Sequence, residues 1–157
     1  MDTLRTFSNR EWNLMATLVL DLAIAALYFS KLASLPEGLA APGSALAGII
    51  VQVIIVACIG AALLFGLINW RTGNREPADE RDRLIEGKGN SIGYGVLVGA
   101  ILLMIGHLVA DALGVGSDTL PVALSTPLIC AHALLICLLA ASTVKHLSQL
   151  VMYRRGI

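Results

Sequence analysis

The chain contains 157 residues, of which 57% are hydrophobic and 14% are charged, and its mean hydropathy is +0.79. Soluble domains of this size rarely carry so large an apolar share, so the composition excludes an ordinary water-soluble enzyme. Eleven basic and eleven acidic residues cancel, and the net charge therefore indicates no class of partner. We expect the lipid bilayer to be the main partner, and we expect no nucleic-acid partner.

Four apolar segments are long enough to cross a membrane. Residues 38–70, 89–110 and 119–144 contain no charged residue, and residues 12–30 contain only Asp21. A spanning helix needs roughly 20 apolar residues. We therefore predict one all-α domain over residues 1–157, an integral membrane four-helix bundle. Its helices are expected near 10–33, 45–70, 90–113 and 121–149, with a cytoplasmic loop over 71–89.

The first segment has two interpretations. Arg5 and Arg10 would suit the charged start of a signal peptide, and Ala23-Ile24-Ala25 loosely matches a cleavage site. Asp21, however, interrupts the apolar run, and the run is long enough to span the membrane. These features favour a retained transmembrane helix.

Asp21 is the first residue that needs an explanation. It follows Trp12 by about 14 Å of helix, which places it near the middle of the bilayer. Ionisable groups at that depth are costly and usually functional. Helical spacing places Thr17, Ala25 and Tyr28 on the same face. We predict that this face points into the bundle or into a polar cavity.

The third segment carries small residues at four-residue spacing: Ser91, Gly95 and Gly99. Small residues let membrane helices approach closely. Packing inside the bundle is the favoured interpretation, and a homodimer formed through the same stripe is the alternative.

A charged segment, EPADERDRLIEGKGN, connects the second and third apolar segments at residues 76–90. Its acidic residues suit the first turn of a helix. Asp79 and Glu80 are spaced to form ion pairs with Arg83 along one helix. We expect one or two turns of surface helix with largely self-paired charges, ended or bent at residues 87–89.

The string DERDRLIE within this segment resembles a D-E-R-D/E-x-x-I motif that precedes a membrane helix in uncharacterised small bacterial multi-pass membrane proteins. The resemblance covers about residues 75–100. It implies a protein of the bacterial cytoplasmic (inner) membrane with a domain of unknown function, allied to a cytoplasmic or membrane protein partner. The docking hypothesis rests on the charged residues of the motif: Asp79, Glu80, Arg81, Asp82 and Arg83.

Two histidines are expected at one depth on neighbouring helices. His107 and His132 both lie about 20 Å from the cytoplasmic side by helical rise. They could be packed neutral imidazoles, ligands of a metal or of haem b, or members of a proton path with Asp21. No cofactor is predicted outright, and the identity of any metal stays open. The candidate ligand or proton site comprises Asp21, His107, His132, Thr17 and Tyr28.

Two further features concern the outer ends of the helices. Lys31 and Asp111 are both expected at the outer headgroup level, and we predict a structural ion pair between them. Pro127 lies within the fourth apolar segment, and it should either kink that helix or mark its true start.

The basic residues set the orientation. With four spans, both termini and the central loop share one side, which holds ten basic residues, whereas Lys31 is alone on the other. The positive-inside rule makes the first side cytoplasmic.

No nucleophile–base pair or metal-binding motif is present in the sequence, so we do not predict an enzyme. We predict an accessory, sensor or interaction subunit that docks a partner through its charged loop. The alternative is a small-molecule, proton or haem-binding protein with a site at Asp21, His107 and His132.

Overall fold

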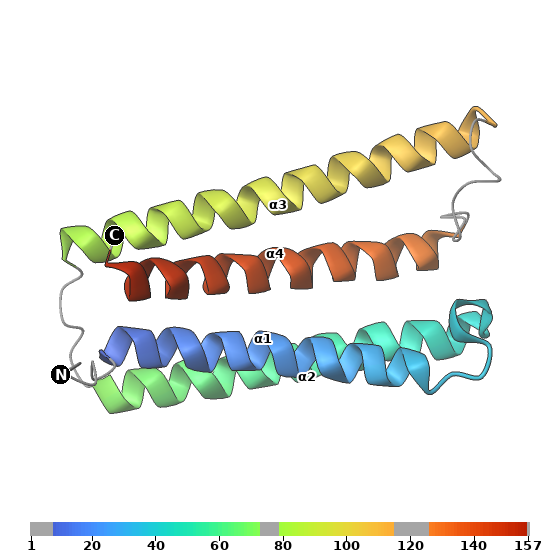
Figure 1. Cartoon of the computed structure of the whole chain (residues 1–157). Coiled ribbons are helices and arrows are strands. Elements are labelled where there is room, and N and C mark those ends of the chain that lie inside the picture. The colour runs from blue at the N-terminus through green and yellow to red at the C-terminus, as the bar shows by residue number, and fades with distance from the viewer. Residues whose placement is uncertain (1–7, 73–78, 115–125, 157) are drawn as a thin grey trace.

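The computed structural model describes residues 8–72, 79–114 and 126–156. These residues form four long α-helices and a short 3-10 helix, η1 (Gly38–Ala40), between the first two (Figure 1). All four α-helices are long and apolar enough to cross a membrane. The predicted all-α class and the four apolar helices are therefore confirmed. The helices are α1 (Asn9–Ala33), α2 (Gly43–Thr72), α3 (Glu80–Ala112) and α4 (Pro127–Arg155).

Helix α3 begins ten residues before the predicted start at residue 90. Asp79 is its N-cap: the Asp79 carboxylate accepts from the backbone N–H of Asp82, and the Asp82 carboxylate accepts from that of Asp79. The expectation that residues 87–89 would end or bend the helix is wrong. A glycine inside a helix costs only about 1 kcal/mol, and Gly89 offsets that cost by letting α4 approach closely.

Helix α4 begins at Pro127, so of the two roles predicted for this proline the second is correct. The Thr126 hydroxyl caps the helix by accepting from the backbone N–H of Ile129 at 3.3 Å. A proline at the first helical position lacks only an N–H that would have no helical partner. The predicted start at residue 121 lies outside the described residues. The helix also continues beyond the predicted end at residue 149, to Arg155.

Helix α4 is the central element of the arrangement. It packs against α1 on one side and against α3 on the other, and α2 packs mainly against α1 (Figure 1). A small buried cluster of Ile24, Tyr28, Ile49 and Val53 joins α1 to α2. Toward its C-terminal end α3 diverges from α4 (Figure 1).

The close approach of α3 and α4 depends on two glycines. Both Gly89 and Gly93 are buried, and a Cβ atom at Gly93 would lie 2.8 Å from Lys145 Cβ and 3.2 Å from the Ala141 carbonyl oxygen. The side chain of Gln149 fills the space beside Gly89 and donates to the Glu86 carbonyl at 3.4 Å.

The stripe predicted for internal packing points elsewhere. Ser91 and Gly95 are exposed, and Cβ atoms at Gly95 and Gly99 would meet nothing within 4 Å. The favoured interpretation of this stripe as an internal packing surface is therefore wrong. Its alternative role in a homodimer stays a prediction.

Gly93→Ala tests the glycine contact. We expect it to destabilise the protein by about 1–3 kcal/mol, because the added methyl group overpacks a helix contact. Gly95→Ala is the matched control, and it should leave stability unchanged or slightly raised, since alanine favours the helix. Thermal unfolding in detergent measures both, and equal losses in the two variants would contradict this account of the packing.

Candidate functional site

The polar stripe of α1 faces the rest of the protein, as the spacing predicts. Asp21 and Tyr28 are both buried between the helices. Thr17 lies on the same stripe, but its hydroxyl donates to the Asn13 carbonyl oxygen of its own helix at 2.8 Å. The stripe therefore offers two side chains, Asp21 and Tyr28, for contacts with α4.

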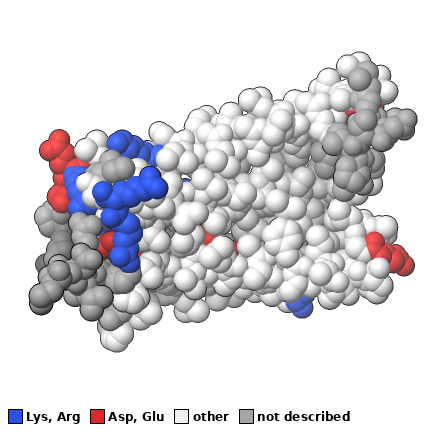
Figure 2. All heavy atoms as spheres, in the orientation of Figure 1, with Lys and Arg blue, Asp and Glu red and all other residues white. Residues whose placement is uncertain are grey.

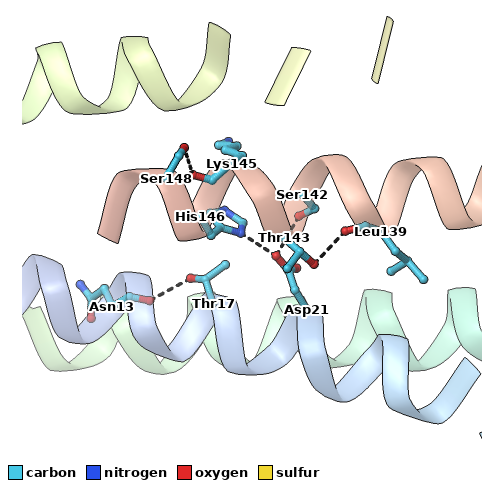
Figure 3. Close-up of polar contacts among 9 residues, drawn as sticks. All are labelled: Asn13, Thr17, Asp21, Leu139, Ser142, Thr143, Lys145, His146 and Ser148. Carbon is cyan, nitrogen blue, oxygen red and sulfur yellow. Dashed lines mark hydrogen bonds and ion pairs between the residues drawn. The ribbon is translucent and has the colours of Figure 1, made fainter. Parts of the chain in front are cut away.

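Asp21 contacts two polar side chains of α4 (Figure 3). The Ser142 hydroxyl donates to Asp21 Oδ2 at 3.0 Å, and His146 Nδ1 lies 2.6 Å from the same oxygen. The side chains of Asp21 and His146 are only 13% and 15% exposed. We call these three residues the Asp21 cluster.

The geometry of the cluster places one proton between a carboxylate oxygen and an imidazole nitrogen. A contact of this length is typical of a charge-assisted hydrogen bond. An isolated carboxylate away from water is very costly, whereas a paired and hydrogen-bonded one is tolerated. The cluster can therefore hold a carboxylate between two apolar helices, and it can exchange the shared proton between two groups.

The arrangement differs from that of a nucleophile with its base. In such a site the imidazole accepts the proton of the hydroxyl, and the carboxylate orients the imidazole. Here Ser142 donates to Asp21 and not to His146. The hydroxyl is thus a hydrogen-bond donor to the carboxylate and is not activated by the imidazole.

His146 was not predicted as a site residue. It follows Lys145 near the charged end of the fourth segment. A usable signal was present, because Ser142 and His146 lie one turn apart and so share a helix face. That face could have been matched to the Asp21 stripe.

A second polar contact joins α1 to α4. Tyr28 Oη and His132 Nδ1 lie 2.9 Å apart, and the two side chains are 0% and 2% exposed. The two rings also contact each other, with centroids 5.8 Å apart. Tyr28 and His132, two of the predicted site residues, are therefore in contact, although the sequence did not predict that they pair with each other.

His107 is not brought to that pair. It lies on the C-terminal half of α3, whereas His132 contacts Tyr28 on α1. The side-chain partners of Asp21 are Ser142 and His146, both on α4. This arrangement does not favour a haem held by both histidines. Within the same described ranges, no group of three or more metal-ligating side chains is placed to hold a metal ion.

The predicted ion pair between Lys31 and Asp111 is not formed among the described residues. Lys31 lies on α1, and Asp111 lies near the end of α3. Helix α4 packs between α1 and α3, and α3 diverges at that end (Figure 1). The two charges are at similar depth but on different sides of the bundle.

Charged side chains gather at the other end of the protein, where α1 and α3 begin and α4 ends (Figure 2). Asp82 joins all three helices. Its carboxylate lies 3.0 Å from Arg10 Nε and accepts from the Tyr153 hydroxyl at 2.8 Å. Arg81 donates to the Tyr153 carbonyl oxygen at 3.2 Å. We call these four residues the Asp82 clamp.

The predicted pairs of Asp79 and Glu80 with Arg83 are not among the ion pairs of the described residues. Asp79 caps the helix instead, because the first N–H groups of a helix lack helical acceptors. Glu80 and Arg83 are exposed. The charges of this segment therefore stabilise contacts between helices more than contacts within one helix.

Comparisons with protein-family models, with curated proteins and with solved structures found no match to this chain. The resemblance of residues 75–100 to small bacterial membrane proteins accordingly stays a prediction. A function has to be inferred from the contacts of the Asp21 cluster and of the Asp82 clamp.

Asp82→Asn tests the clamp. The variant loses the charge that attracts Arg10 and weakens two further hydrogen bonds, so we expect a loss of about 1–3 kcal/mol in stability. Glu80→Gln removes the same charge two residues earlier, at an exposed position, and should change stability by less than about 0.5 kcal/mol. Thermal unfolding of both variants in detergent distinguishes a clamp from a solvated charge cluster.

Proposed function

We propose that the protein is a non-enzymatic membrane subunit that binds and releases a proton at the Asp21 cluster and acts as a proton-responsive sensor. The observation that carries this proposal is the contact of 2.6 Å between Asp21 Oδ2 and His146 Nδ1 inside a membrane-spanning helix pair. Ionisable groups within spanning helices commonly mark ion or proton pathways.

The chemistry of the pair supports a response to protonation. Asp21 and His146 can share one proton or hold two, and the second state breaks the attraction between a carboxylate and an imidazolium. Electrostatic changes of this kind are large where water is scarce. Because the pair joins α1 to α4, a change in its protonation acts on the contact between these two helices.

The contact between Tyr28 and His132 is a second polar contact between α1 and α4. Tyr28 lies about 10 Å beyond Asp21 along α1, and its partner His132 belongs to the same helix as His146. The α1–α4 contact thus contains two pairs of ionisable side chains at successive depths. Such a series is consistent with proton exchange along this contact.

The location that we propose is the bacterial cytoplasmic membrane, with both termini on the cytoplasmic side. The charge distribution supports this orientation, because Arg10 of α1, Arg81 of α3 and Arg154 of α4 lie at one end of the bundle. Basic residues are retained on the cytoplasmic side. The Asp21 cluster then lies nearer the cytoplasm than the Tyr28–His132 pair does.

A second candidate function is docking of a cytoplasmic or membrane protein partner. Glu80 and Arg83 favour it, because both are exposed at the charged end while their neighbours Arg81 and Asp82 are engaged between helices. The docking surface would then comprise Glu80 and Arg83, and the remaining motif residues would position it.

Infrared difference spectroscopy of the protein in lipid nanodiscs tests the proton site. A pH change should produce a band from the protonated Asp21 carboxyl group, and Asp21→Asn should abolish it. His146→Gln should change the frequency of this band, because the imidazole no longer forms a hydrogen bond with the carboxyl group. Asp111→Asn is the control: this exposed carboxylate should leave the band of Asp21 intact. A pH-dependent carboxyl band that survives Asp21→Asn would refute the proposal.

Charge reversal tests the docking candidate without disturbing the clamp. A Glu80→Lys/Arg83→Glu variant should lose a protein that co-purifies with the wild type, while its thermal stability stays unchanged. Lys88→Glu, about one and a half turns beyond Arg83 along α3 and also exposed, is the control and should retain that partner. Retention of the partner by the reversed variant would place docking elsewhere.

A further inference from the structure

Helix α2 has two opposite faces with different surroundings. One face packs against α1 and α4: Leu46, Ile49 and Val53 are buried, and Gly60 lies beside Leu20 of α1. These contacts use one stripe of the helix. The opposite stripe is exposed along its whole length, and nothing else in the described part of the chain covers it.

The positions along the middle of the exposed face recur in steps of four and three residues, as on any helix face. A second helix can pack along such a line in a left-handed coil. At 3.6 residues per turn these positions lie about 200° from the centre of the buried face. Cβ atoms at its two glycines would meet nothing within 4 Å. We call this stripe the α2 seam; it comprises Gly48, Gln52, Ile55, Ile59, Ala62 and Gly66, all exposed.

Gln52 is the residue of the seam that lipid alone does not satisfy. It lies about 14 Å along α2 from Gly43, within the uncharged stretch of residues 38–70. A hydrocarbon core of about 30 Å covers about 20 of the 30 residues of α2, and a centred span includes Gln52 in its outer part. Within the described ranges, no hydrogen bond is made by its side-chain amide. Acyl chains offer neither a hydrogen-bond donor nor an acceptor, so a hydrogen bond to another polar group would stabilise this amide.

We infer that the α2 seam is the contact surface for a second copy of this chain. A carboxamide is self-complementary, because it carries both an N–H donor and a C=O acceptor. All copies insert in the same orientation, so a twofold axis along the membrane normal places Gln52 opposite Gln52 at the same depth. Glutamine side chains that bond across membrane helices favour association, and glycines at the ends of the seam let the backbones approach.

The seam is independent of the proton site. It lies on the face of α2 that points away from α1, and no residue of the Asp21 cluster belongs to it. It is also distinct from the alternative homodimer stripe of Ser91, Gly95 and Gly99, which lies on α3. The two stripes predict different contacts between copies, so an experiment can separate them.

The test measures association of the full-length protein in lipid nanodiscs or liposomes by fluorescence energy transfer between labelled copies. Gln52→Leu should weaken the dimer about tenfold, the scale of an interhelical hydrogen bond in model membrane peptides. Gly48→Leu should also weaken it, because the side chain occupies the space of the second backbone. Gly95→Leu, on α3, should leave association unchanged. Because these positions are exposed, each variant should retain the thermal stability of the wild type.

Disulfide cross-linking gives a second readout in a Cys58→Ser background. Ile55→Cys should form covalent dimers on oxidation in the membrane, since a twofold axis brings the two cysteines together. Gly95→Cys on α3 should not. Efficient cross-linking through Gly95→Cys without Ile55→Cys, association that is unaffected by Gln52→Leu, or a wild-type protein that stays monomeric in the bilayer would each overturn the inference.

Discussion

A carboxylate in the hydrocarbon layer has to be surrounded by hydrogen-bond donors or neutralised, because the bilayer offers no water to replace them. Asp21 meets this need with Ser142 and His146, and both donors come from α4. The docking of α1 on α4 therefore depends on a polar contact more than on apolar area. In a membrane this is a strong constraint, since the lipid tails satisfy apolar side chains as well as a neighbouring helix does. The Tyr28–His132 contact joins the same two helices again, nearer the C-terminal end of α1.

Helix α4 uses a different kind of contact on each side. Toward α1 it presents ionisable groups, and toward α3 it fits beside glycines, where Gly93 lets the helix backbone near Ala141 come close. At the charged end the Asp82 clamp ties the start of α1 and the start of α3 to the end of α4. The ionisable pair and the clamp thus share α4.

The number of helices and their apolar character could be predicted from the sequence, because long uncharged runs are a direct consequence of bilayer thickness. The burial of Asp21 and Tyr28 could also be predicted, since helical spacing fixes which residues share a face. The hydrogen-bond partners of Asp21 and Tyr28 could not be predicted. Whether His132 turns toward His107 or toward Tyr28 depends on the rotation of α4 about its axis, and periodicity within one segment does not determine that rotation.

The errors at the ends of the helices have a similar origin. Gly89 was treated as a local signal for the end of a helix, but its role comes from the Gln149 side chain of another helix. Asp79 and Glu80 were matched to Arg83 by spacing alone. The first N–H groups of α3 provide better partners for Asp79, and the side chains of Arg10 and Tyr153 bind the neighbouring Asp82. Tertiary contacts and caps decided each of these positions.

The divergence of α3 from α4 has a mechanical consequence. The uncharged part of α3, residues 89–110, is about 33 Å long, which is close to the thickness of a hydrocarbon core. Its tight contacts, at Gly89, Gly93 and the clamp, all lie in its N-terminal half. In a bilayer thinner than the apolar stretch of a helix, the helix tilts. The C-terminal half of α3 can therefore change its inclination with membrane thickness more easily than the half that packs against α4.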